Sequence, residues 1–184
     1  MNDELRSTPT PAIATREVAL ATPFFQLIAK RLVGQGAGEP YYSLNLSDYV
    51  SVVATTVAGE IILVRQFRPA VEAVTLELPA GHVEPGQEPD EAARVELAEE
   101  TGFTADRLTL VGCLKPDTGR LGNRMWVYAA AGAKRLDAWQ PEAGVAVTLV
   151  PATDLPRRLA DGTFDHALHV ASLFLAVRAG FITL

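Results

Sequence analysis

The sequence predicts an α+β protein, arranged as an α/β/α sandwich with a mixed central sheet and a small additional β-sheet near its N-terminus. Several short β-branched segments precede a helix, more strands follow it, and a long apolar helix comes last. This order of elements is typical of helices that cover the faces of a sheet. With 184 residues and an apolar fraction of 48%, the chain can bury a sizeable core.

The N-terminal part divides into a tail and a small sheet. Residues 1–16 are rich in Thr, Pro and Ala and lack periodicity, which predicts a flexible tail. Residues 17–47 contain short apolar pieces interrupted by the glycine-rich stretch 34–40, which indicates two or three strands. Residues 48–184 would then form the main domain.

Hydrophobic periodicity and turn residues divide the main domain into elements. Strands are expected at residues 49–57, 61–67, 71–78, 108–114, 124–131 and 145–150. Helices are expected at residues 88–101, 155–160 and 165–179. On the first helix we expect Ala93, Val95 and Leu97 to be buried, and on the last helix Leu168, Ala171 and Leu175 to share one apolar stripe.

Composition excludes several classes of protein. A net charge of −6 without a basic stripe or tail argues against nucleic-acid binding. The single cysteine, Cys113, which we expect in a strand core, rules out an intrachain disulfide and fits a reducing compartment. No apolar stretch approaches the length of a membrane span, and the N-terminus lacks a secretion signal. We therefore expect a cytoplasmic protein that binds neither nucleic acid nor membrane.

Three glutamates gather near the end of the expected helix 88–101. Glu96, Glu99 and Glu100 are spaced three and four residues apart, so their side chains share a face and repel one another. A solvated acidic face is the alternative for the trio taken alone. Hard cations such as Mg²⁺ or Mn²⁺ would make the arrangement favourable, because they prefer oxygen ligands. The turns at 78–81 and 85–86 favour the metal interpretation, since such a loop can aim backbone carbonyls at the same ions.

Residues 81–103 resemble the Nudix box, a long and specific motif. The matching positions are Gly81, Glu96, Leu97, Glu99, Glu100, Gly102 and Phe103. The resemblance implies a Nudix fold, with residues 48–184 as its catalytic domain, and hydrolysis of a nucleoside diphosphate linked to another moiety. It also implies that Glu96 and Glu100 hold Mg²⁺ or Mn²⁺ and that Glu99 assists in catalysis.

The segments 64–69 and 75–81 resemble the branch of ADP-ribose and nucleoside-diphosphate-sugar pyrophosphatases. In that branch the carbonyl matching Ala80 also binds metal, and the arginine matching Arg68 lies near the substrate diphosphate. An ion pair with Glu72 or Glu77 is the alternative for Arg68.

The same branch uses its N-terminal sheet for dimerisation and to stack the substrate base between aromatic rings. The resemblance therefore implies a homodimer formed through residues 17–47. The candidates for the stacking contact are Phe25, Tyr41, Tyr42 and Tyr49, although packing is the simpler interpretation of any single aromatic residue.

Two positions depart from the box. Gln87 stands where the family has its first glutamate, and Val95 stands where it has an arginine that pairs with that glutamate. Removing one partner of a buried pair costs about 3–5 kcal/mol, whereas replacing both can be nearly neutral. We interpret the two changes as compensating, so that Val95→Arg alone would destabilise the fold and the double revertant would recover.

Two loops remain open in their roles. The loop 115–124 is unusually basic, and its Arg120 is a candidate for binding phosphate, with a solvated hairpin tip as the alternative. Asn123 occupies the place of a glutamate that typical relatives carry there.

For the general base, the resemblance points to the loop 137–144, where Glu142 is the best candidate although it aligns about one residue out of register. Asp117 and Asp137 are fallback candidates.

The sequence thus predicts a homodimeric, Mg²⁺- or Mn²⁺-dependent hydrolase of ADP-ribose or a nucleotide sugar, which releases a nucleoside monophosphate and a sugar phosphate. The alternative is a catalytically impaired Nudix-fold module that binds nucleotides or regulates a partner. The departures at Gln87, Val95 and Asn123 and the displaced Glu142 motivate it. The retained carboxylate trio argues against it, because a cluster of like charges is a cost without metal.

Overall fold

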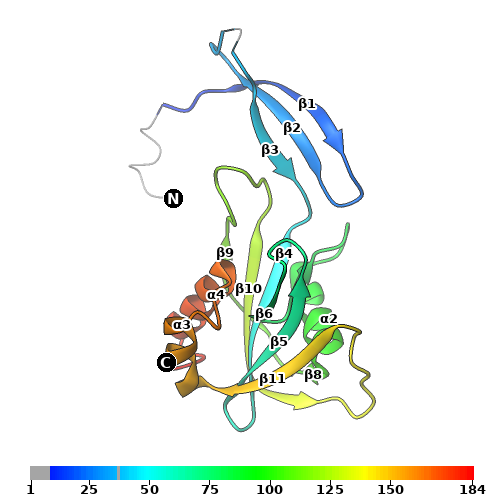
Figure 1. Ribbon diagram of the computed structural model, residues 1–184, viewed down its shortest axis with the longest axis vertical. Helices are drawn as coiled ribbons and strands as arrows, with labels where there is room; N and C mark the ends of the chain where they lie inside the picture. The colour runs from blue at the N-terminus through cyan, green and yellow to red at the C-terminus, as the bar shows by residue number, and fades with distance from the viewer. Residues whose placement is uncertain (1–8, 37) are drawn as a thin grey trace. The chain divides into compact units, whose positions relative to one another are not determined.

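The computed structural model describes residues 9–36 and 38–184, and these fall into two compact units (Figure 1). The first unit extends to Leu46 and includes the loop Asp117–Asn123, while the second comprises Ser47–Pro116 and Arg124–Leu184. The division after Leu46 lies one residue from the limit expected for the main domain.

The first unit is built on an antiparallel sheet of three strands, β1 (Ile13–Ala21), β2 (Gln26–Leu32) and β3 (Tyr41–Asn45). Strand β1 begins inside the segment 1–16 that was expected to be a tail, and residues 1–8 lie outside the described residues. The loop Asp117–Asn123 runs beside β3, since Leu44 donates its N–H to the carbonyl of Arg120 at 2.8 Å and accepts from the N–H of Gly122 at 3.0 Å.

The second unit contains a mixed sheet with strands in the order β11–β5–β4–β10–β8, while β6, β7 and β9 pair with β5, β4 and β10. Its strands are β4 (Tyr49–Thr56), β5 (Glu60–Arg68), β6 (Ala73–Glu77), β7 (Ala80–His82), β8 (Phe103–Thr104), β9 (Thr109–Leu114), β10 (Met125–Arg135) and β11 (Val145–Pro151). The central strands β4 and β10 run parallel, and their other pairings are antiparallel. The central strand β4 is buried on both faces, as its unbroken Val-rich sequence predicts.

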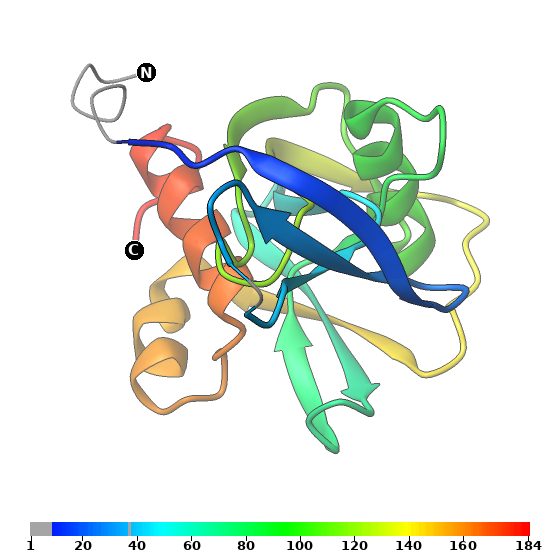
Figure 2. The ribbon, with the colours of Figure 1, turned by 90° about the horizontal axis from the view of Figure 1, so that it is seen from above.

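Helices cover both faces of this sheet. Helix α2 (Pro89–Thr101) packs on one face through Ala92, Ala93 and Leu97. A short 3₁₀ turn (Ala152–Asp154), α3 (Leu155–Ala160) and α4 (Ala167–Arg178) cover the other face. Figures 1 and 2 show α2 and α4 on opposite sides of the sheet. The predicted α/β/α sandwich with a mixed sheet and a small N-terminal sheet is therefore confirmed. None of the helices in the described residues is long and apolar enough to cross a membrane.

Two burial predictions are wrong, and the most buried face of α4 differs by one residue from the predicted stripe. Val95 is 38% exposed, because it lies two positions from both Ala93 and Leu97 and points away from their face of α2. On α4, Leu168 and Leu175 pack against the core but are only partly buried, and the fully buried residues are His169, Ser172, Leu173 and Ala176. Cys113 is exposed although it lies two residues from the buried Val111, because a register shift in the β9–β10 pairing at Val111 interrupts the alternation of side chains along β9.

Two strand limits differ from the prediction by two residues or more. Strand β6 begins at Ala73 instead of residue 71, because residues 69–72 form a turn in which Glu72 adopts a positive φ of 53°. Strand β10 continues to Arg135, four residues beyond the prediction, where it gains β8 as a partner.

Candidate active site

Helix α2 carries its carboxylates at the unfavourable end. Asp90 and Glu91 in the first turn suit the positive end of the helix dipole, and Pro89 suits its start. Gly102, with a φ of 69°, ends the helix and donates its N–H to the carbonyl of Ala98 at 2.9 Å. The last turn contains no basic residue. The remaining glutamates therefore face the negative end of the dipole without an internal counter-charge.

The loop before the helix is shaped around these glutamates. A Cβ atom on Gly81 would lie 1.9 Å from Oε1 of Glu96, so only glycine leaves room for that carboxylate. Glu100 is 7% exposed, and its Oε2 accepts a hydrogen bond from the N–H of Ala80 at 3.0 Å. The structure thus brings Ala80, Gly81, Glu96 and Glu100 together, as the Nudix resemblance implies.

Both carboxylates lack a cation of their own. Burial, together with the charges of Glu99, Glu142 and Glu84, raises the pKa of Glu96 to about 7. Burial likewise raises the pKa of Glu100 to about 7, against the opposing effects of the Ala80 N–H and the Arg68 guanidinium.

The ion pairs found within the described chain include neither Glu96 nor Glu100. Carboxylate oxygens and a backbone carbonyl are the donors that Mg²⁺ and Mn²⁺ prefer. The carboxylates of Glu96 and Glu100 therefore fit a divalent cation, and the Nudix resemblance implies the carbonyl of Ala80 as a further ligand.

Arg68 is fixed beside this site by a buried partner. Its Nε and Nη2 donate to Oε1 and Oε2 of Glu77 at 2.8 and 2.7 Å, and Thr75 donates its hydroxyl to Glu77 at 2.6 Å. Glu77 is fully buried, and although burial acts to raise its pKa, these bonds lower the pKa to about 2. Arg68 itself is 41% exposed. Of the two partners considered from the sequence, the structure selects Glu77.

A second group, formed by Glu77, His166 and His169, brings ligand-type atoms within 4.8 Å of one another. Two of its three members already hold hydrogen-bond partners, whereas the buried Nδ1 of His166 has none among the described residues. Arg68 and Thr75 occupy the carboxylate of Glu77, and Nδ1 of His169 accepts the N–H of Leu78 at 3.1 Å. Burial lowers the pKa of His169 to about 3, so the ring stays neutral, with its other nitrogen carrying the proton. We conclude that this group supports the strand end that leads to Ala80.

The other candidates from the sequence lie in different settings. Glu142 is exposed in the β10–β11 connection, close enough to raise the pKa of both Glu96 and Glu100. Glu99 is exposed on α2 beside Glu96. Tyr49 stacks on His82, with ring centroids 5.1 Å apart. Arg120 is exposed and belongs to the first unit.

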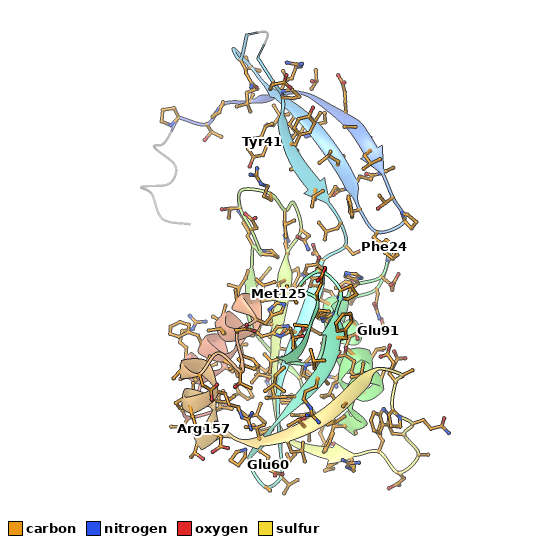
Figure 3. The ribbon with its side chains drawn as sticks, viewed as in Figure 1. Phe24, Tyr41, Glu60, Glu91, Met125 and Arg157 are labelled. Atoms are coloured by element: carbon orange, nitrogen blue, oxygen red, sulfur yellow. The ribbon has the colours of Figure 1, made fainter. Side chains whose placement is uncertain are left out.

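Sequence reasoning missed one contact near these residues. Trp139, in the same connection as Glu142, donates its indole N–H to the carbonyl of Glu99 at 2.8 Å. The available signal was a single aromatic residue within the loop 137–144. In Figure 3, Glu91 marks the exposed face of α2 and Met125 marks the start of β10.

The NUDIX domain family matches residues 46–170, which is more than half of the chain. The chain belongs to this family. The family expected from the box is therefore confirmed, and the match begins one residue before the second unit.

Named relatives point to one branch of the family. The chain is 29% identical to the ADP compounds hydrolase NudE of Escherichia coli over 92% of its own length and 93% of that protein. It is 42% identical to the ADP-ribose pyrophosphatase of Bacillus subtilis, over 44% of each protein. The match thus spans less than half the length of that relative. A crystal structure of an ADP compounds hydrolase superposes with a TM-score of 0.77 at 25% identity, covering 94% of this chain and 95% of that one.

Proposed function

We propose that the protein hydrolyses a nucleoside diphosphate linked to another moiety, with ADP-ribose or a nucleotide sugar as the substrate class, in a Mg²⁺- or Mn²⁺-dependent reaction. One observation carries this proposal: Glu96 and Glu100 are gathered at the negative end of α2 with no ion-pair partner among the described residues. The relatives named as ADP-ribose pyrophosphatase and ADP compounds hydrolase support the substrate class.

Each residue of the candidate site would have a distinct role in such a reaction. When bound, the divalent cation would supply positive charge to the diphosphate oxygens. Arg68, held in one orientation by Glu77, would present its guanidinium to a phosphate, a geometry that suits paired oxygens. Glu142, with Glu99 as the alternative, would take the proton from the attacking water. The products would be a nucleoside monophosphate and a sugar phosphate.

The direct test is a panel of nucleoside diphosphate compounds assayed with the purified protein. The panel contains ADP-ribose, ADP-glucose, UDP-glucose and a dinucleoside diphosphate, each with Mg²⁺, Mn²⁺ or EDTA. We expect release of a nucleoside monophosphate, detected by chromatography, only when metal is present. Turnover that is unchanged by EDTA, or absent from every compound, would contradict the proposal.

The same panel tests the alternative of an impaired binding module. Such a module would bind a nucleotide, detected by calorimetry, without releasing products. The retained trio Glu96, Glu99 and Glu100 argues for turnover, because a cluster of like charges is a cost without metal and would be the first feature lost once function is lost.

We further propose that two copies associate through the N-terminal sheet. Within β1, β2 and β3 only Ser43 is buried, so this sheet has no core of its own. Val18 and Leu20 on β1 are 56% and 53% exposed, and two neighbouring tyrosines on β3 are also exposed. Apolar exposure of this kind is typical of an interface. Light scattering should give the mass of a dimer for the wild-type protein. The double variant Val18→Glu/Leu20→Glu should have the mass of a monomer. A monomeric wild-type protein would refute the association.

The cytoplasmic location expected from the single cysteine stays a prediction. Fractionation of cells that express the tagged full chain tests it. Recovery outside the cytoplasmic fraction would contradict it.

A further inference from the structure

The connection between β10 and β11 is fastened to the end of α2. It leaves β10 after Arg135, whose guanidinium lies 5.2 Å from the centre of the Phe103 ring, and runs beside α2 and β8 (Figure 1). The backbone N–H of Leu136 donates to the carbonyl of Gly102 at 2.8 Å. Three residues later, the indole of Trp139 donates to the carbonyl of Glu99 at 2.8 Å.

One of these bonds satisfies a backbone carbonyl at the C-terminal end of α2. The last carbonyls of an α-helix have no partner within the helix and must be satisfied from elsewhere. At the end of α2 the connection supplies one such partner, to Glu99, and it also bonds the carbonyl of Gly102, the residue that follows the helix. The loop is therefore attached to the same turn that carries the candidate metal ligand Glu100.

Trp139 also packs against that turn. A Cβ atom built on Gly102 would lie 2.5 Å from Cδ2 of the indole, so the ring rests directly on the glycine backbone. Gly102 is consequently required twice, for its positive φ of 69° and for the close approach of the ring. The packing and the hydrogen bond together fix where the loop leaves the helix.

Glu142 follows three residues after this contact, and its carbonyl accepts the N–H of Val145 at 3.1 Å as the chain enters β11. Its charge acts on both Glu96 and Glu100. The exposed carboxylate thus belongs to a short segment held at Trp139 on one side and at β11 on the other.

We propose that Trp139 is a positioning residue, which holds the β10–β11 connection against the last turn of α2 and thereby sets Glu142 beside the Glu96 and Glu100 carboxylates. This inference rests on the proposed function for its catalytic consequence, and the placement of Glu142 has an additional consequence for cation binding. A carboxylate kept near the other two adds to the affinity for a divalent cation. Loss of Trp139 therefore weakens both catalysis and cation binding, and it does so only through Glu142.

The experiment is a double-mutant cycle with Trp139→Ala and Glu142→Gln in the full chain. We expect Glu142→Gln to lower kcat by about 10²–10⁴-fold and Trp139→Ala to lower it by about 10²-fold, the size of effect that a small misplacement produces. The KM should change little in both. The double variant should match Glu142→Gln alone, since two residues that act as one unit are not additive. Losses that multiply in the double variant would overturn the inference.

Two further variants separate positioning from folding. Trp139→Phe keeps a ring on Gly102 and loses only the N–H bond, so its kcat should lie between those of Trp139→Ala and the wild type. Trp126 on β10 also donates its indole N–H, in this case to Asp48 at 3.0 Å. Trp126→Phe is therefore the matched control, because it removes the same kind of hydrogen bond elsewhere in the fold. It should keep kcat within about twofold. An equal loss in both Trp→Phe variants would mean that a general structural effect explains the result.

A second readout does not depend on turnover. The midpoint of Mn²⁺ titration, followed by melting temperature, should shift to several-fold higher concentration in Trp139→Ala, in Glu142→Gln and equally in the double variant. The Mn²⁺ titration tests the inference even if no compound of the substrate panel is hydrolysed. A lack of hydrolysis would refute the proposed function but not the positioning role of Trp139. An unchanged Mn²⁺ midpoint in Trp139→Ala would overturn the positioning role.

Discussion

Glu77 at the end of β6 and Glu100 at the end of α2 are both buried carboxylates, yet their pKa values lie far apart, at about 2 and about 7. The first has Arg68 and Thr75 as bonded partners, whereas the second has one backbone N–H and a neighbouring carboxylate. The folded chain therefore stabilises one buried charge internally and leaves the other in need of an external cation. On our proposal, this difference separates a contact that supports the fold from a site that binds metal.

The largest effect that tests the comparison is on activity. Glu100→Gln keeps the shape of the side chain and an oxygen for the Ala80 N–H, but it removes the charge. We expect kcat to fall by more than about 10²-fold, since charge stabilisation of several kcal/mol would be lost. Steady-state assays with the best substrate of the panel measure it. Glu91→Gln, an exposed change on the same helix, is the control and should behave as wild type (Figure 3).

Glu77→Gln should have its main effect on stability. It leaves Arg68 without its partner, at a cost of about 3 kcal/mol, the lower end for a broken buried pair because Arg68 is 41% exposed and can be hydrated. The melting temperature should fall by about 6–12 °C. Arg68→Met combined with Glu77→Gln should recover part of this loss. If Glu77→Gln melts like the wild type, the pair does not stabilise the fold.

The two carboxylates should also respond to pH with opposite signs. For Glu96 and Glu100 the folded pKa is about 7, above the ordinary 4.5, so their contribution is fully present below pH 4.5 and is lost as pH rises through 7. For Glu77 the folded pKa is about 2, so its contribution is present above pH 4.5 and is lost as pH falls towards 2.

Melting curves without metal from pH 4.5 to 8.5 test this expectation. The melting temperature of Glu100→Gln minus that of the wild type should increase with pH. The difference is the proper readout, because His169, which is neutral when folded, contributes a slope of the opposite sign in both proteins. A flat difference curve would show that Glu100 carries no raised pKa.

The smallest effect concerns the altered half of the box. Val95 is 38% exposed, so an arginine there can reach water, and Oε1 of Gln87 accepts the N–H of Glu84 at 3.1 Å, a bond that glutamate can also form. The large penalty expected from the sequence for Val95→Arg alone is therefore revised to about 0.5 kcal/mol. Chemical denaturation of the single and double revertants measures it. A loss of several kcal/mol that the double revertant restores would support the original expectation.

The sequence predicted features that follow from spacing along the chain. The carboxylate face of α2, its stop at Gly102 and the layers of the sandwich all depend on local periodicity. The choice between Glu72 and Glu77 depended on the pairing of β6 with β5 and on the turn at Glu72, which no local pattern reveals.

Contacts between distant segments were similarly hidden from the sequence. The bond from Trp139 to Glu99 joins residues 40 positions apart. The burial of His169 required the phase of α4 against the sheet, which its almost uniformly apolar sequence did not fix. Periodicity marks a face only when polar residues mark the opposite one.

The central claim is that Glu96 and Glu100 bind a divalent cation. Titration of the EDTA-treated protein with Mn²⁺ at pH 8, followed by melting temperature, tests it most directly. At 100 times the dissociation constant, binding should stabilise the wild type and the Glu91→Gln control by about 2.7 kcal/mol, or about 5–11 °C. Glu100→Gln should show little or no rise. An equal rise in Glu100→Gln, or none in the wild type, would contradict the account.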